Sequence, residues 1–306
     1  MTRVAVLGGG GFGRSLASQV ARVGKRVMLW SREHRDIGEA GVEATTRFAD
    51  VAEAELVFVA VPSLHVATLA REVGHYLDGA HFMVHVSRGL LGPELGTITQ
   101  LVRELTPVRR VGVLAGPLVA RALASGEPGG GIVGSLFPEV GDAVRDAIGG
   151  PTLRIYSTQD VVGVEVASAM VGLLALAIGW AQGRGFGPST TAILATRGMA
   201  EAARIGVACG AEERTFSGLA GFGDLTAAVA GDERPETLFG RALAEGLPLA
   251  QAAERAGAFV EGTSIAENAT AFAQRHGFEA PICTAMAALL SGRASPNDVL
   301  MQLMTR

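Results

Sequence analysis

The sequence contains few charged residues and few cysteines, which limits the kinds of partner that it can bind. Charged residues make up 18% of the 306 positions, and the formal net charge is -4 with both signs scattered along the chain. This balance supplies neither the basic surface that binds nucleic acid nor a polybasic patch for a membrane. The two cysteines, Cys209 and Cys283, stand in apolar segments without metal-ligand spacing, so we expect buried free thiols in a reducing compartment and no metal site.

No segment has the features of a signal peptide or of a membrane span. The first residues, MTRVAVLGGGG, run directly into a folded motif without the apolar core and cleavage site of a secretion signal, and we expect a cytoplasmic protein. Residues 166–181, VASAMVGLLALAIGWA, carry no charge at all. A bilayer-spanning helix needs about 17–25 apolar residues, so this run is slightly short. Its glycines and alanines suit close packing, and we predict a buried central helix.

The order of the apolar segments predicts two domains. Short β-rich runs alternate with helical patterns up to Tyr156, as in a parallel sheet with crossover helices, and beyond that point the strands stop. We predict an α/β fold, with a Rossmann-type doubly wound sheet in residues 1–158 and an all-helical domain in residues 159–306. The apolar content of the second half is compatible with a homodimer without requiring one. The expected strands are residues 3–7, 26–30, 56–61, 81–86, 110–115, 130–135 and 152–156.

A glycine motif predicts a dinucleotide site at the first strand. VLGGGGFG contains the pattern Gly8-x-Gly10-x-x-Gly13 between an expected strand and an expected helix. The first glycine permits a tight turn, the second lets the backbone approach a pyrophosphate, and the third allows close packing of helix on strand. The phosphates would lie on the N-terminus of the helix, where free N–H groups favour an anion. The predicted cofactor-binding residues of this loop are Gly8, Gly10, Gly11, Phe12 and Gly13.

The end of the second strand favours NADP over NAD. A site for NAD usually places Asp or Glu there to bind the ribose 2′-hydroxyl. This chain has Ser31 and Arg32 in that place, with no acidic residue before Glu33. We predict that Ser31 and Arg32 contact the cofactor and that Arg32, together with Arg35, neutralises a 2′-phosphate. The alternative is that both arginines are solvated surface residues.

Two more strand ends carry residues suited to a ligand site. VAVPSLH places Pro62 at the carboxyl edge of the sheet, and HVSRGL places Ser87 and Arg88 at the same edge. Ligands of open α/β sheets bind at this edge, so we assign Pro62 and Arg88 to the cofactor site. His65 follows in the first of these segments. His85 is a possible acid–base group, and the alternative is a hydrogen-bonded structural histidine.

With these motifs, the chain resembles the bacterial NAD(P)-dependent glycerol-3-phosphate dehydrogenases. The resemblance spans nearly the whole length and implies reversible hydride transfer between NAD(P)H and dihydroxyacetone phosphate, in a cleft between a Rossmann domain and a helical domain. It also places Ala120 and Glu261 at the cofactor and Gly116 at the substrate. The shared segments, in the family's order, are VAVPS, RGL, AGPLVARALASGEP, GVEVASAM, GRGFG, TRGMAEAARIGVACGA, FSGLAGFGDL and FVEGT.

Lysine, which this family uses in catalysis, occurs once in the chain, as Lys25. Aligned through GVEVASAM and GRGFG, the family's Lys-Asn pair falls on Val171 and Gly172. Lys25 precedes the second strand, at the sheet edge away from the expected cofactor, so no lysine can serve. A second family lysine becomes Arg88, which keeps the positive charge but is a poor proton donor because the pKa of arginine lies above about 12.

The remaining candidates leave two interpretations open. The family's Arg-Asn pair for the substrate phosphate falls on Pro235 and Glu236, and Arg234 can substitute if the register slips by one residue. We therefore assign Asp224 and Arg88 to catalysis, and Gly116, Asp224 and Arg234 to a small-molecule substrate. The first interpretation is a glycerol-3-phosphate dehydrogenase-like oxidoreductase with a divergent active site. The second is an inactive NAD(P)-binding homologue that acts as a sensor or interaction protein.

Overall fold

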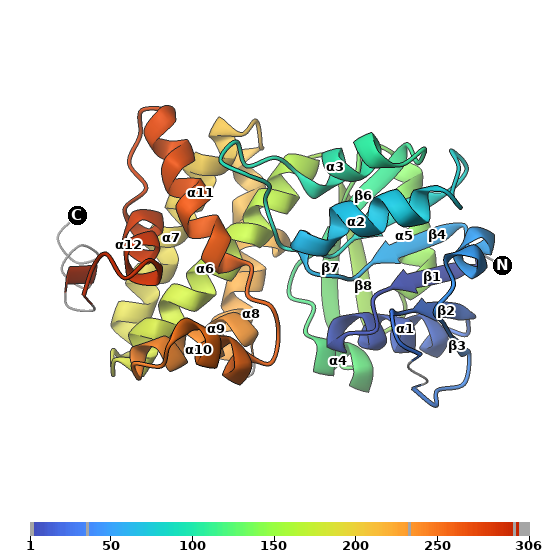
Figure 1. The fold of residues 1–306 in the computed structure, drawn as a ribbon, viewed down its shortest axis with the longest axis horizontal. Helices are drawn as coiled ribbons and strands as arrows, with labels where there is room; N and C mark the ends of the chain where they lie inside the picture. Colours follow the sequence, from blue (N-terminus) through green and yellow to red (C-terminus); the bar gives the residue numbers. More distant parts are fainter. Residues whose placement is uncertain (1–2, 35–36, 232–233, 296–297, 300–306) are drawn as a thin grey trace. The chain divides into compact units, whose positions relative to one another are not determined.

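The computed structural model describes residues 3–34, 37–231, 234–295 and 298–299. The chain forms two compact units (Figure 1). Unit 1 comprises Met1–Ser87 and Thr97–Glu165, and unit 2 comprises Arg88–Gly96 and Val166–Arg306. The short segment Arg88–Gly96 thus belongs to the second unit although it lies within the first half of the sequence. A domain boundary between residues 158 and 159 stays a prediction.

Unit 1 contains an eight-stranded sheet with the strand order β3-β2-β1-β4-β5-β6-β7-β8. Its first six positions, 3-2-1-4-5-6, are the order of the dinucleotide-binding doubly wound fold. Together with the helices that follow in the second half, this confirms the predicted fold class. The strands are β1 (Val4–Leu7), β2 (Val27–Trp30), β3 (Val42–Thr45), β4 (Leu56–Val59), β5 (Phe82–His85), β6 (Arg110–Ala115), β7 (Gly129–Gly134) and β8 (Leu153–Thr158).

The sheet differs from the sequence-based expectation in two respects. The strand β3 was not expected, because its sequence VEAT is short, contains a single buried residue and lies at the edge of the sheet. The pair β6–β7 is antiparallel, with Val113 opposite Gly134 and Ala115 opposite Ile132, so a wholly parallel sheet is wrong at this point. The connection between these two strands contains only the short helix α4 (Ala120–Ser125), and the chain turns back beside β6.

The helices of unit 1 form two groups along the sheet. Helix α1 (Gly11–Arg22) contacts α4 and α5 (Pro138–Ile148), whereas α2 (Ser63–Gly74) contacts α3 (Ile98–Leu105). A short 3-10 helix covers Phe48–Glu53. One apolar core joins side chains of the strands to the buried faces of α1, α4 and α5. Parallel strands with helices on both sides are hidden from water on both faces. This core holds the carboxyl ends of β1, β2 and β4 in fixed positions.

The described residues of unit 2 from Val166 onward form helices and the turns that connect them. Prolines occupy the first position of α7, α9 and α12, where the missing N–H costs no hydrogen bond. A five-residue π-helical turn (Leu219–Gly223) leads directly into α8. The helices are α6 (Val161–Gly183), α7 (Pro188–Ala208), α8 (Asp224–Ala230), α9 (Pro235–Ala244), α10 (Leu249–Ala256), α11 (Gly262–Arg275) and α12 (Pro281–Leu290), with a 3-10 turn at Glu213–Ser217.

Helix α6 is the buried helix that its uncharged sequence predicts. It is the one helix among the described residues that is long and apolar enough to cross a membrane, and 94% of its most apolar window is buried within the protein. Glycines allow it to pack directly on α9. A Cβ atom on Gly179 would lie 2.2 Å from the carbonyl oxygen of Thr237, and one on Gly240 would lie 2.1 Å from that of Leu176. The two helix backbones are therefore in contact, and α6 is core.

Candidate functional site

The loop between β1 and α1 requires glycine at two positions. Gly8 has a φ of +133°, and a Cβ there would lie 2.3 Å from the carbonyl oxygen of Ala60. A Cβ on Gly13 would lie 1.9 Å from the carbonyl oxygen of Gly8. By contrast, nothing lies within 4 Å of a Cβ built on Gly10 or Gly11. The two outer positions thus fix the turn, while the middle of the loop leaves open space for a ligand to approach the backbone.

The N-terminus of α1 is suited to an anion. Its N-cap is Gly10, no side chain caps it, and its first turn contains no acidic residue. The first N–H groups of a helix have no partner within the helix, and together with the helix dipole they attract negative charge. The side chain of Phe12 packs against the apolar core of unit 1, so this residue offers its backbone rather than its ring. The loop has the geometry that the glycine spacing predicts.

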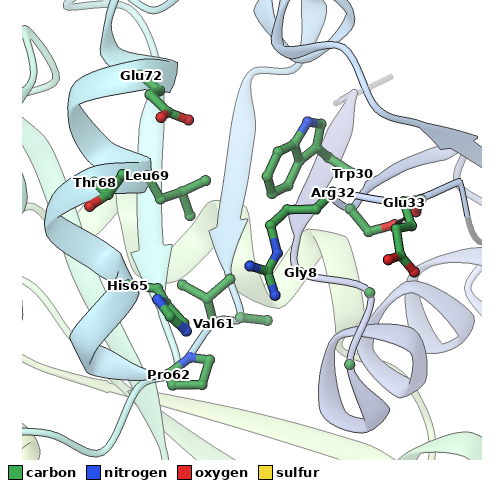
Figure 2. Close-up of a pocket in the computed structure, with 14 residues that line it drawn as sticks. Gly8, Trp30, Arg32, Glu33, Val61, Pro62, His65, Thr68, Leu69 and Glu72 are labelled. Atoms are coloured by element: carbon green, nitrogen blue, oxygen red, sulfur yellow. Dashed lines mark hydrogen bonds between the residues drawn. The ribbon is translucent and has the colours of Figure 1, made fainter.

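A cavity of about 460 Å³ opens beside this loop. Figure 2 shows the Arg32 side chain extending into it, between Gly8 and the residues of α2, whereas Glu33 lies on the side away from α2. Within the part of the chain that the structure describes, no hydrogen bond or ion pair engages the Arg32 guanidinium. The lining residues are Gly8, Gly9, Gly10, Trp30, Ser31, Arg32, Glu33, Ala60, Val61, Pro62, His65, Thr68, Leu69 and Glu72.

Several predicted cofactor residues therefore lie together in unit 1. Ser31 and Arg32 follow β2, Pro62 is the N-cap of α2, and the glycine loop faces both. The Ser31 hydroxyl donates a hydrogen bond to the carbonyl oxygen of Glu33. Arg35, which we expected beside Arg32, lies outside the described residues. The cavity thus joins Ser31, Arg32 and Pro62, which the sequence placed at the carboxyl ends of separate strands.

The histidine that ends β5 has structural partners. The Nε2 atom of His85 lies 3.3 Å from the Thr99 hydroxyl and 3.4 Å from Oε1 of Glu165. Its Nδ1 atom is buried and has no hydrogen-bond partner among the residues that the structure describes. Glu165 accepts hydrogen bonds from the first two N–H groups of α3, of Ile98 at 2.6 Å and of Thr99 at 3.1 Å. His85 is fully enclosed, in agreement with the alternative of a hydrogen-bonded structural histidine.

Other predicted residues are distributed over both units. Gly116, with a φ of +111°, follows β6 in unit 1, and Ala120 begins α4 in the same unit. Glu261 is buried in unit 2 at the N-cap of α11. Lys25 forms an ion pair with Asp146 in unit 1, in the turn after α1 and hence at the sheet edge opposite the glycine loop. The single lysine of the chain is therefore held away from the predicted site.

Unit 2 brings Arg88, Asp224 and Arg234 together around one buried carboxylate. Asp224 begins α8 and is 1% exposed. Arg234 donates hydrogen bonds of 2.9 and 3.2 Å to its two carboxylate oxygens, and one of 3.1 Å to its carbonyl oxygen. Arg88 donates a further bond to the same carboxylate. Burial raises the pKa of Asp224, but the two guanidinium groups lower it more, so that the pKa lies below its usual value and the group is ionised.

Glu236 is a fourth member of this cluster, which sequence reasoning missed. Its Oε2 accepts a 3.2 Å hydrogen bond from Nε of Arg234, and its side chain is 9% exposed. Burial lowers the pKa of Arg234, but the negative charges of Asp224 and Glu236 raise it by more, so that the pKa lies above its usual value. In the sequence, Glu236 was recognised only as the residue that stands where the related family has an asparagine. A signal was nevertheless present, because an acidic residue two positions after an arginine can neutralise it.

Glu236 also lies against α6, at the position that the resemblance gives to the family's catalytic pair. Oε1 of Glu236 lies 3.7 Å from a Cβ built on Gly172. The neighbouring Val171 is fully buried. Arg88, Asp224, Arg234 and Glu236, called the arginine–carboxylate cluster below, thus carry two positive and two negative formal charges beside an apolar stretch of α6.

Comparisons with known proteins agree with this architecture. The N-terminal model of the NAD-dependent glycerol-3-phosphate dehydrogenases matches residues 3–40 and 37–139, and the C-terminal model matches residues 160–301. The glycerol-3-phosphate dehydrogenase (NAD(P)+) of Nitratidesulfovibrio vulgaris is 34% identical over 99% of this chain and 98% of its own. That of Caulobacter vibrioides is 33% identical over 99% of this chain and 97% of its own.

A solved structure extends the likeness to three dimensions. The crystal structure of glycerol-3-phosphate dehydrogenase from Coxiella burnetii matches with a TM-score of 0.93 and 25% identity, over 100% of this chain and 99% of that one. The two family models cover nearly the whole chain between them, in the order N-terminus then C-terminus. The chain therefore belongs to the NAD-dependent glycerol-3-phosphate dehydrogenase family.

Proposed function

We propose that the protein is an NAD(P)-dependent oxidoreductase that acts on a CH–OH group, prefers NADP, and has a divergent active site. The observation that carries the cofactor part is the glycine loop together with the Arg32 guanidinium, which extends into the adjoining cavity and is unpaired among the described residues. Gly8 and Gly13 leave no room for a side chain, and Gly10 leaves the backbone open to a pyrophosphate. When bound, the cofactor supplies or accepts the hydride.

Arg32 supports the preference for NADP. The 2′-phosphate of NADP carries negative charge that must be neutralised, and a planar guanidinium binds phosphate oxygens with two parallel hydrogen bonds. The residue that follows, Glu33, lies on the side away from α2 (Figure 2). No described residue competes for the Arg32 side chain, so a bound phosphate would not have to break an existing ion pair.

The substrate side supports slow or redirected turnover. Reduction of a ketone adds a hydride to carbon and a proton to oxygen, and the developing alkoxide needs a cation nearby. Val171 offers neither a proton nor a charge, and Arg88 offers charge without a usable proton. The proton would then come from water. Loss of a general acid typically costs about 10²- to 10⁴-fold in rate, so we expect weak activity on dihydroxyacetone phosphate.

The presence of Val171 in place of a lysine also favours a second function. The fully buried Val171, in the place of the family's lysine, is compatible with a protein that binds NAD(P) but has lost catalysis and serves as a sensor or interaction partner. A panel assay separates the two functions. Oxidation of NADPH is followed by absorbance with dihydroxyacetone phosphate and with small 2-keto and 3-keto acids. Turnover of any of them excludes the inactive protein, whereas a melting temperature raised by NADPH without any turnover favours it.

The cofactor preference has its own test. A charge-assisted hydrogen bond contributes about 1.5–3 kcal/mol, so Arg32→Ala should weaken NADPH binding about 10- to 100-fold and leave NADH binding nearly unchanged. Fluorescence titration measures both dissociation constants. Arg154→Ala is the matched control, since Arg154 is exposed on β8, outside the cavity lining. Equal losses for the two cofactors in Arg32→Ala would contradict a contact with the 2′-phosphate.

A further inference from the structure

Helix α2 lines the cavity beside the glycine loop with one of its faces. The lining residues of α2 follow the spacing i, i+3, i+4 and i+7, which places side chains on one side of a helix; they are His65, Thr68, Leu69 and Glu72. Figure 2 shows the Glu72 carboxylate extending from α2 toward the side on which Trp30 lies. Within the described chain, no hydrogen bond or ion pair engages this carboxylate. The glycine loop and Arg32 do not account for this acidic group in the cavity.

The order of the groups in NADP directs its base toward this face. In the function proposed above, the pyrophosphate lies at the glycine loop and the 2′-phosphate at Arg32. The base is attached to the ribose carbon next to the one that carries the 2′-phosphate, so we expect it beside Arg32 and farther from the loop. Leu69, Glu72 and Trp30 line this part of the cavity (Figure 2).

The walls of this part of the cavity suit an aromatic base. The Trp30 ring stacks on that of Phe48, with 4.3 Å between the ring centroids, and its N–H donates a 3.0 Å hydrogen bond to the carbonyl oxygen of Thr46. These contacts hold the indole in place and use its single donor. Leu69 adds a second apolar side chain from α2. Apolar and aromatic walls with few polar groups are typical of small-molecule sites, in which the polar groups decide specificity.

A carboxylate in such a site can distinguish one purine from another. Ionised glutamate accepts hydrogen bonds and donates none. Adenine carries an exocyclic amine, which donates. Hypoxanthine has a carbonyl oxygen at the same place, so that two acceptors would face each other and both would lose a partner. A glutamate next to this edge of the base therefore favours adenine.

We propose that Glu72 is a specificity-determining residue for the cofactor, whose carboxylate accepts a hydrogen bond from the exocyclic amine of adenine. The proposal rests on the cofactor part of the proposed function and extends it from the 2′-phosphate to the base. Arg32 follows β2 and Glu72 belongs to α2, and both extend into the same cavity (Figure 2). The two residues thus read two different groups of one adenosine.

NADPH and its hypoxanthine analogue, reduced nicotinamide hypoxanthine dinucleotide phosphate, form a matched pair for the test, because they differ in the base alone. Both carry the same fluorescent dihydronicotinamide, so a fluorescence titration of the full, unaltered chain measures both dissociation constants. We expect NADPH to bind at least about 10-fold more tightly, as for the loss of one hydrogen bond to a charged group. Binding of the two within about 3-fold of each other overturns this proposal alone. Binding of neither overturns the proposed function as well.

The variant Glu72→Gln tests the residue itself. Its amide keeps an acceptor for adenine and gains a donor for the hypoxanthine oxygen. The variant should therefore bind the hypoxanthine dinucleotide at least about 3-fold more tightly than the unaltered protein does, and its preference for NADPH should fall. A merely structural defect would weaken the binding of both dinucleotides. Glu139→Gln, an exposed acid on α5 outside the cavity lining, is the control and should keep the preference. An unchanged preference in Glu72→Gln contradicts the proposal.

Discussion

Replacement of Asp224 by alanine should lower the free energy of unfolding more than replacement of an exposed charged residue does. The substitution removes the acceptor of bonds from two guanidinium groups, of which Arg234 is almost enclosed. Removing one partner of a buried ion pair typically costs about 3–5 kcal/mol, because the other charge stays buried without compensation. At about 2–4 °C per kcal/mol for a unit of this size, the melting temperature should fall by about 6–20 °C.

Thermal and urea unfolding, followed by circular dichroism, measure this loss. Asp142→Ala is the matched control, since Asp142 pairs with Arg145 on the surface and its side chain is 71% exposed. Exposed pairs contribute about 0–1 kcal/mol, so the control should unfold almost as the unaltered protein does. If Asp224→Ala and Asp142→Ala unfold within about 1 kcal/mol of each other, the buried cluster does not carry the stability that its geometry implies.

The pH dependence and three further substitutions test the same physical reasoning elsewhere. The native pKa of Asp224 is lowered, so its contribution to the free energy of unfolding is fully present above the unfolded pKa of about 3.9. That contribution is lost as the pH falls through the native pKa. The difference in the free energy of unfolding between the unaltered protein and Asp224→Asn, measured by urea unfolding, should therefore be constant from about pH 7 to 5 and shrink at lower pH. Gly13→Ala should abolish NADPH binding in a fluorescence titration, because its Cβ would collide with the loop's own carbonyl, whereas Gly79→Ala, with open space around it, should bind normally. Gly240→Ala should cost about 1–3 kcal/mol or more by separating α6 from α9, and an unchanged melting temperature would contradict their direct contact. Glu201→Ala should cost about 1–3 kcal/mol in thermal unfolding, since this buried carboxylate accepts two N–H bonds, 2.9 and 2.8 Å long, at the start of α12.

The features that local sequence encodes were predicted well. The glycine loop could be recognised from the spacing of Gly8, Gly10 and Gly13, although the room at Gly8 is limited by the distant Ala60. The strands of the sheet's interior follow from apolar runs bounded by glycine and proline. The prolines at the first turns of α7, α9 and α12 mark helix starts for an equally local reason. The buried state of α6 could be inferred because sixteen uncharged residues are difficult to expose to water.

What the sequence did not reveal depends on distant pairing. An apolar strand pattern carries no direction, so the antiparallel pair β6–β7 was not foreseen. The strand β3 lies at an edge and buries too little to leave a clear pattern. In unit 2, Arg88 pairs with Asp224 across 136 positions, a contact that only the tertiary fold creates. Glu236 was missed because its position depends on a hydrogen bond with Arg234 and on the space beside Gly172, which has no side chain.

The segment Arg88–Gly96 has a consequence for how the polypeptide can be divided and made. The chain passes between the two units at residues 87–88, 96–97 and 165–166, so neither unit is a continuous piece. A C-terminal fragment expressed alone would lack Arg88, the donor to Asp224, and Glu94, the ion-pair partner of Arg275. On the ribosome, where synthesis proceeds from the N-terminus, these nine residues emerge long before the helices that receive them. Their partners, Asp224 and Arg275, both lie in the last third of the chain. The helical unit can therefore be completed only after that part has been synthesised.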